Sequence, residues 1–131
     1  MTEPEKVKII EASGANDVAV LRKLVKSGTA LNFHALDGLT PLINAAKNGS
    51  HEALIYLLEA GADPNYVGDS NTSAAYWAAI NCHKDTFMSI TRYKGSLRVP
   101  PAVETSFLER INQCSDKNFA KMVVSHIQHE K

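Results

Sequence analysis

Apolar residues recur along this chain at a spacing of 33 residues. Four sets of equivalent apolar positions, here called columns, share the spacing: Ile9, Leu42, Ala75 and Leu108; Ala12, Ala45, Ala78 and Ile111; Leu21, Leu54, Phe87 and Ala120; and Leu24, Leu57, Ile90 and Val123. A polar pair, Asn32 and Asn65, keeps the same interval. Self-similarity at such a period is the signature of a repeat array. We therefore predict one domain of four stacked units, at about residues 4–36, 37–69, 70–102 and 103–131.

Within each unit the pattern predicts a helix, a short turn, an antiparallel helix and a loop that leads to the next unit. The expected helices begin near Pro4 and cover 18–27, 41–48, 51–60, 74–81, 84–94, 102–113 and 116–129. Thr2, Asp17 and Asp116 precede three of these helices as capping residues. In the last helix Phe119, Met122, Val123 and Ile127 form an apolar stripe. The predicted fold class is all-α.

The second unit carries the most regular motif, Gly38-Leu39-Thr40-Pro41-Leu42-Ile43-Asn44-Ala45-Ala46-Lys47-Asn48-Gly49, followed by Leu57-Leu58-Glu59-Ala60-Gly61-Ala62-Asp63-Pro64-Asn65. The Thr40 hydroxyl can cap the first helix, and Pro41 suits the first turn, where no backbone donor is needed. Gly61 can end the second helix in a left-handed conformation. This segment resembles an ankyrin repeat. The resemblance implies a solenoid of stacked helix-turn-helix units with protruding loops, and a binding function.

The third and fourth units depart from the motif. In the third, Ser73 keeps the capping hydroxyl, but Asn71 and Cys82 replace two glycines. The glycine expected at position 94 is displaced to Gly95. Pro100-Pro101 then stiffens the chain. This segment is interpreted as a helix entry at Pro101, as a change in the packing angle of the last unit, or as a specialised contact loop.

Composition narrows the class of partner. Lys plus Arg and Asp plus Glu both number 14, so the formal charge is zero and no basic footprint for nucleic acid is expected. No apolar stretch reaches the length of a membrane span. The first residues lack the pattern of a secretory signal, so we expect a cytoplasmic protein that is a monomer when free. Cys82 and Cys114 lie in equivalent turns that stacking can bring together, but a cytoplasmic location favours two reduced thiols.

In proteins of this type the partner usually meets the loop tips and the exposed sides of the first helices. Carried over by position, the resemblance gives these partner-binding candidates: Phe33, Leu36, Asp37, Leu39, Lys47, Asn48, Tyr66, Asp69, Ser70, Thr72, Tyr76, Trp77, Ile80 and Asn81. Tyr76 and Trp77 are the main candidates, because Tyr and Trp are common binding hot spots. The alternative for Trp77 is a core position beside Ala74 and Ala75. Leu36 and Leu39 are expected as exposed apolar residues at a tip.

Evidence for catalysis is sparse. His126 and His129 are three residues apart and could chelate a metal, so a site near Cys114, His126 and His129 is the enzymatic alternative. No phosphate-binding loop, paired CxxC or nucleophile elbow is present. We expect no enzyme, cofactor or metal, and instead a protein-binding module such as a small inhibitor or immunity-type protein. An adaptor or an effector fits the sequence equally well.

Overall fold

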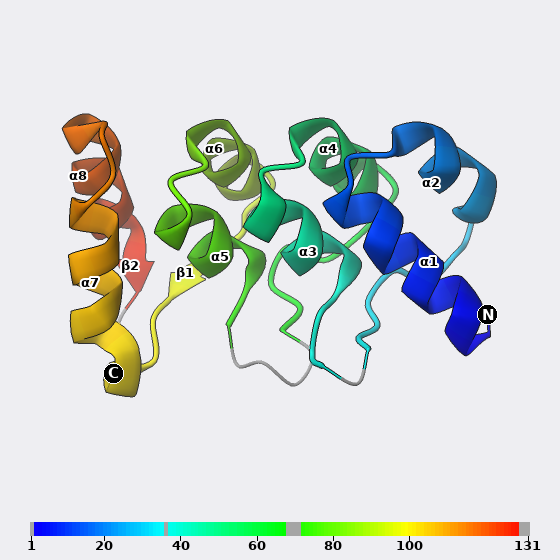
Figure 1. Ribbon diagram of the computed structural model, residues 1–131, viewed down its shortest axis with the longest axis horizontal. Helices are drawn as coiled ribbons and strands as arrows, with labels where there is room; N and C mark the ends of the chain where they lie inside the picture. Colours follow the sequence, from blue (N-terminus) through cyan, green and yellow to red (C-terminus); the bar gives the residue numbers. More distant parts are fainter. Residues whose placement is uncertain (1, 36, 68–71, 129–131) are drawn as a thin grey trace.

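The computed structural model describes residues 2–35, 37–67 and 72–128. Within them the helices are α1 (Glu3–Gly14), α2 (Val18–Leu24), α3 (Pro41–Asn48), α4 (His51–Glu59), α5 (Ala74–Ile80), α6 (Lys84–Arg92), α7 (Glu104–Asn112) and α8 (Lys117–His126). Figure 1 shows these helices as pairs standing side by side, with α1, α3 and α5 in one layer and α2, α4 and α6 in a second. The predicted all-α repeat solenoid is confirmed.

The same turn closes the first three helix pairs. Asn16, Gly49 and Cys82 lie 33 residues apart, and their φ angles are 58°, 67° and 60°. In each turn the next amide donates to a carbonyl in the preceding helix: Asp17 to Ala12, Ser50 to Ala45, and His83 to Ala78, each at 2.9 Å. Together these two features make a Schellman-type ending, which satisfies carbonyls that the helix leaves open. The backbone conformation of the turn therefore repeats every 33 residues, as the apolar side chains do.

Most predicted helix caps are confirmed. Asp17 accepts from the Val20 amide at 3.2 Å, and Thr40 accepts from the Ile43 amide at 2.9 Å. Asp116 accepts from the amides of Asn118 and Phe119. Ser73 is the exception: its hydroxyl makes no cap and donates instead to the Ser96 carbonyl at 3.1 Å.

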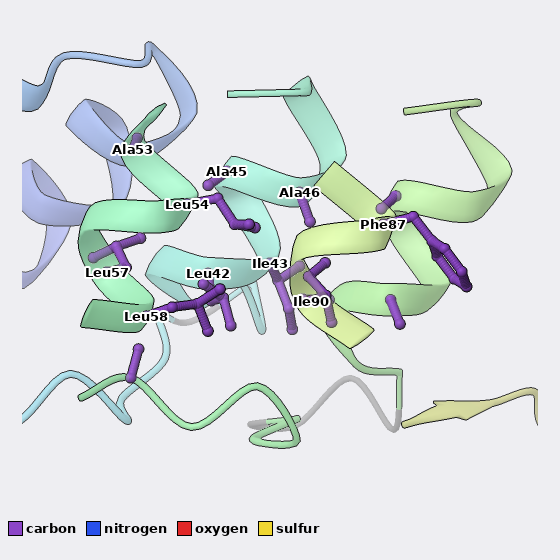
Figure 2. Packing of buried hydrophobic residues seen from close by; sticks show 14 of the residues in the cluster. Leu42, Ile43, Ala45, Ala46, Ala53, Leu54, Leu57, Leu58, Phe87 and Ile90 are labelled. Carbon is purple, nitrogen blue, oxygen red and sulfur yellow. The ribbon is translucent and has the colours of Figure 1, made fainter. Parts of the chain in front are cut away.

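The core is continuous along the stack (Figure 2). Ala45, Ala46, Ala78 and Ala79 are fully buried. Their small side chains allow neighbouring helices to approach closely. The column that runs through Leu57, Ile90 and Val123 is also fully buried, whereas its first member, Leu24, is only half-buried at the end of the stack.

The asparagine pair ties successive loops together. The Asn32 side chain accepts from the Asp63 amide at 2.9 Å. One repeat later Asn65 accepts from the Ser96 amide at 2.8 Å and donates to the Lys94 carbonyl at 3.2 Å. Each loop is thus fixed to the next by bonds to backbone groups that lack a partner in a helix.

The last helix pair differs from the others in orientation. A short 3₁₀ turn, η1 (Pro101–Val103), leads into α7, so the interpretation of Pro101 as a helix entry is confirmed. Figure 1 shows α7 and α8 turned relative to the preceding pairs. The strands β1 (Leu97–Arg98) and β2 (Ile127–Gln128) pair in parallel.

Two predicted helices run three residues past the observed ends. The helix predicted for 18–27 ends at Leu24, where Val25 turns to extended backbone. The helix predicted for 116–129 ends at His126, because Ile127 leaves the apolar stripe to pair with Leu97 in the strand. The position of Asn71 lies outside the described residues.

Candidate functional site

Part of the predicted partner-binding set lies together where α3 and α5 adjoin. Lys47 and Asn48 come from the end of α3, whereas Tyr76 and Trp77 lie on α5. We call the group Lys47, Asn48, Thr72, Tyr76, Trp77 and Asn81 the α3–α5 surface. All six residues are exposed or half-buried, so their side chains are accessible for contact with a partner.

Trp77 is held in place by polar groups on both sides. Its indole N–H donates to the Thr72 hydroxyl at 3.0 Å. The Lys47 ammonium lies 5.2 Å from the ring centroid, within the range of a cation–π contact. Asn81 donates to the Trp77 carbonyl at 2.9 Å. The two predicted alternatives for Trp77 were core and surface, and its side chain is half-buried: one part packs on the core and the rest is accessible.

Tyr76 continues this arrangement toward the last unit. Its ring meets Trp77 edge-on, with centroids 5.4 Å apart, and stacks on Phe107 at 5.2 Å. We call Trp77, Tyr76 and Phe107 the aromatic row. Phe107 is buried and was not predicted as a site residue, because α7 lacks the repeat motif that places the other residues. Its position, one repeat after Ala74, was the available signal.

Other predicted candidates do not join this surface. Phe33 and Ile80 are buried, at 9% and 8% exposed, and therefore have little side chain to offer a partner. The Lys6 ammonium lies 5.9 Å from the Phe33 ring centroid and covers it. Leu39 is half-buried against the core, so the expectation of an exposed apolar tip is wrong for this residue.

The remaining candidates are loop residues. Tyr66 is half-buried, and its hydroxyl lies 2.9 Å from Nδ1 of His34. Asp37 is exposed and accepts from the Leu39 amide at 3.1 Å. Leu36, Asp69 and Ser70 lie outside the described residues.

Neighbouring turns are joined by polar side chains that link successive units. Between the first and second units, Asn16 accepts from the Ala53 amide at 2.9 Å and Ser50 donates to the Gly14 carbonyl at 2.7 Å. Between the second and third, His83 Nε2 lies 3.2 Å from the Lys47 carbonyl. His83 therefore links the turn of the third unit to the end of α3 in the second.

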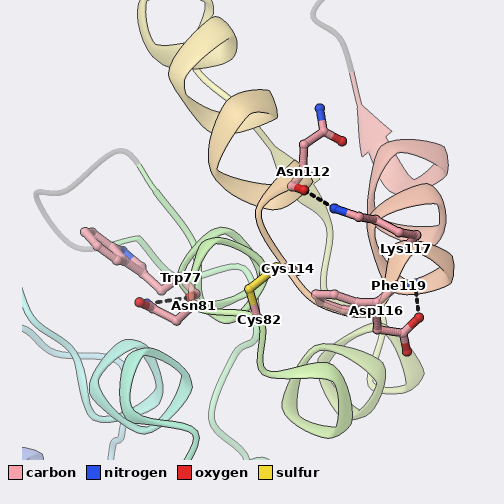
Figure 3. The surroundings of a disulfide bond; sticks show 8 residues. All are labelled: Trp77, Asn81, Cys82, Asn112, Cys114, Asp116, Lys117 and Phe119. Carbon is pink, nitrogen blue, oxygen red and sulfur yellow. Dashed lines mark hydrogen bonds between the residues drawn. A yellow bond between two sulfur atoms is a disulfide. The ribbon is translucent and has the colours of Figure 1, made fainter.

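Between the third and fourth units the link is covalent. Cys82 and Cys114 form a disulfide with their Cα atoms 5.7 Å apart, which corrects the expectation of two reduced thiols (Figure 3). Stacking of the two turns places the residues at a normal disulfide distance. Beside the disulfide, Lys84 and Asp116 form an ion pair at 3.4 Å across the same junction.

Two carboxylates have shifted pKa values. The pKa of Asp116 is lowered mainly by the hydrogen bond from the Phe119 amide, with help from Lys84. The pKa of Glu52 is lowered mainly by the hydrogen bond from the Asn16 side chain, which lies 2.7 Å away. Both carboxylates act in capping or in contacts between units, so these shifts do not indicate catalysis.

The described residues give no support for a metal-binding site or for a membrane-spanning helix. They contain no group of three or more His, Cys, Asp or Glu side chains that could hold a metal ion. Cys114 is bonded to Cys82, and His129 lies outside the described residues. Among the helices of this part of the chain, none is long and apolar enough to cross a bilayer.

An open pocket of about 460 Å³ lies far from the α3–α5 surface, on the outer side of α1 and α2. Its lining residues are Lys8, Glu11, Ala12, Ala15, Asp17, Val20, Lys23 and Leu24. One repeat later, the equivalents of Glu11, Asp17 and Val20 are Asn44, Ser50 and Ala53. Those three contact the first unit, with Asn44 donating to the Ile10 carbonyl at 2.8 Å. The pocket is therefore the repeat equivalent of an internal stacking face.

Comparison with known proteins agrees with the geometry. The family model described as ankyrin repeats (3 copies) matches residues 9–94, which is more than half of the chain. The chain is 38% identical over 69 residues to ankyrin repeat protein nuc-2 of Neurospora crassa. It is also 38% identical over 65 residues to SH3 and multiple ankyrin repeat domains protein 2 of Homo sapiens. Each match covers 50% of this chain but only 6% and 4% of the two relatives.

Proposed function

Since the chain belongs to the ankyrin-repeat family, we propose that it binds a protein partner through the α3–α5 surface. Ankyrin repeats generally mediate protein–protein interaction, and we infer that the chain is not an enzyme. In this proposal the four helix pairs act as one domain, in which the first and last pairs serve as caps.

The main support for the proposal is the ordered, half-buried indole of Trp77. Its indole is half-buried, and Thr72 and Lys47 hold it in one orientation. A large aromatic side chain that is already ordered loses little conformational entropy when a partner covers it. Trp is also the residue type most often found as a hot spot. Asn48 and Asn81 add polar groups at the edge, which is where interfaces keep their hydrogen bonds.

The test replaces Trp77 with alanine and compares capture of partners from native lysate by mass spectrometry. We expect Trp77→Ala, alone or with Tyr76→Ala, to weaken capture by about tenfold or more, as loss of a hot spot does. Tyr93→Ala is the matched control, because Tyr93 is an exposed aromatic residue, 39% accessible, at the end of α6 in the other layer. Circular dichroism checks that each variant is folded. Capture by Trp77→Ala at unchanged affinity would show that the assigned surface is wrong.

We further propose that the protein acts stoichiometrically, as a small inhibitor or immunity-type protein that blocks its partner, with an adaptor or effector role as the second candidate. A preformed contact surface, in which Thr72 and Lys47 hold Trp77 in one orientation, fits one-to-one binding of a partner in either role. An activity assay of the captured partner, with and without the chain, distinguishes the two. The whole-protein roles of the relatives are not carried over, because the matches span so little of their length.

A cytoplasmic location remains part of the proposal, as does a monomeric free state. The disulfide is the observation against that location, because thiol-rich compartments keep most cysteines reduced. Alkylation of thiols in intact cells, followed by mass spectrometry of Cys82 and Cys114, tests it directly. Light scattering tests the monomeric state.

A further inference from the structure

We propose that the Cys82–Cys114 disulfide is a thiol-sensitive clamp that holds the last helix pair, and with it the aromatic row, in the position needed for binding. The effect on binding rests on the proposed function of the α3–α5 surface. The effect on the conformation of α7 and α8 does not, and it can be measured without any partner.

The first argument is the place of the disulfide in the repeat. Earlier units are joined at this turn by hydrogen bonds from Asn16, Ser50 and His83. At the third junction Asp116, the equivalent of Ser50 and His83, keeps a polar contact with Lys84. Cys82, the equivalent of Asn16, adds the bond to Cys114. The clamp therefore adds a covalent link whose state depends on the surrounding thiols.

The second argument is the conformation of Cys82. Its φ angle is 60°, in the left-handed region that non-glycine residues adopt at a cost, and the equivalent residue one repeat earlier is Gly49. The other non-glycine residue of this column, Asn16, uses its side chain to contact the next unit. The disulfide gives the reason for a residue that the backbone alone disfavours.

The third argument is how the last pair is held. Besides apolar packing of residues such as Phe119 and Val123, the described contacts of the last pair with the preceding units are the exposed Lys84–Asp116 ion pair and the short pairing of β1 with β2, which follows α8. An exposed ion pair adds little stability. Figure 3 shows the disulfide at the point where the chain leaves α7 for α8. Since Phe107 lies on α7 and stacks on Tyr76 at 5.2 Å, the clamp also fixes one end of the aromatic row.

The two ends of the disulfide differ in accessibility. Cys82 is an exposed residue, whereas Cys114 is buried at 2%. A thiolate of an external dithiol therefore attacks Sγ of Cys82, forms a mixed disulfide there and releases the Cys114 thiolate, which takes up a proton. The second thiolate of the dithiol then attacks the dithiol sulfur that is bonded to Cys82, and the Cys82 thiolate is released. The protein disulfide gains two electrons and the dithiol becomes a cyclic disulfide.

The experiment is hydrogen exchange, read by mass spectrometry, on the full chain with and without dithiothreitol. We expect amides of α7 and α8 to exchange about 30-fold faster or more after reduction, the low end of what a disulfide closing a loop of this size contributes. Amides of α1 and α3 should change little. A loss of partner capture on reduction, with Trp77→Ala deficient in both states, supports the link to binding.

Matched variants separate the clamp from side effects of the reductant. Cys82→Gly with Cys114→Ala removes the bond and gives the turn a residue that adopts its φ angle freely. Cys82→Ser with Cys114→Ser is the second pair. Both should exchange as the reduced chain does and should not respond to dithiothreitol. Unchanged exchange of α7 on reduction, equal acceleration of every helix, or alkylation of both cysteines in the untreated chain would overturn the proposal.

Discussion

Gly95 shows how one displaced residue can mislead a reading by period. The glycine column runs through Gly28 and Gly61, so position 94 should hold the left-handed residue. The structure keeps that backbone at Lys94, with φ of 67°. Lys94 donates to Thr91 and Gly95 donates to Ile90, which repeats the ending at Gly61 and Ala62. Gly95 is glycine for another reason, since a Cβ there would meet the Ile90 side chain and lie 2.8 Å from its carbonyl oxygen.

We therefore expect Gly95→Ala to lower the free energy of unfolding by about 1–3 kcal/mol, because the backbone of Ile90 cannot move aside cheaply. Lys94→Gly should instead raise it by about 0.5–1 kcal/mol by relieving the left-handed conformation. Urea denaturation of both variants measures the difference. If Gly95→Ala were neutral, the close approach to Ile90 would be wrong.

At the scale of elements, the caps were the most predictable feature. Asp17, Thr40 and Asp116 were identified from residue type and position alone, because a cap depends on atoms only two or three residues away. Ser73 failed as a cap because the Ser96 carbonyl, distant in sequence, competes for its hydroxyl. The end of α8 failed for a similar reason, since the pairing with β1 decides where the helix stops.

The cap of α8 predicts a dependence on pH. The lowered pKa of Asp116 means that its carboxylate stabilises the folded state fully above the ordinary aspartate value of about 3.9. This contribution decreases as the pH falls below that value and is lost once the pH passes through the lowered pKa of the folded state. We expect Asp116→Asn to keep the cap but to reduce this loss of stability at low pH, because asparagine caps well and does not titrate.

Thermal unfolding of both proteins from pH 7 to pH 2 measures the effect. Glu52→Gln is a second test at the first junction: the pKa of Glu52 is also lowered, so this change should likewise reduce the loss of stability in acid. A loss of stability in acid unchanged by Asp116→Asn would contradict the role given to the carboxylate.

At the scale of the whole molecule, the apolar columns predicted the stack because burial repeats with the period. They could not predict the α3–α5 surface in full. Ile80 occupies a first-helix position yet is buried, and Phe33 follows the asparagine column yet lies under Lys6. Two of the three residues of the aromatic row, Trp77 and Tyr76, were predicted, and Phe107 was missed. The 33-residue spacing gives the sequence position of Phe107 but not its contact with Tyr76, because α7 and α8 are turned relative to the preceding pairs (Figure 1).

Position in the stack should set the cost of a core change. Leu24 and Leu57 are equivalent by period, but Leu57 is fully buried between neighbours and Leu24 is half-buried at the end. We expect Leu57→Ala to cost about 3–4 kcal/mol of unfolding free energy and Leu24→Ala about 1–2 kcal/mol. Chemical denaturation of the matched pair measures both values. Equal losses would show that the first unit is buried as deeply as the second.

The pocket on the outer side of α1 and α2 makes the array extendable. The residues that line the pocket are the repeat equivalents of those through which the second unit contacts the first. An engineered helix pair appended before residue 2 would therefore meet a matching packing surface. Three changes, Glu11→Asn, Asp17→Ser and Val20→Ala, would give that surface the residues found one repeat later. The 33-residue period supplies the length of the graft. In a chain lengthened in this way, the present first helix pair would have a neighbour on both sides, and Leu24 would no longer lie at the end of the stack.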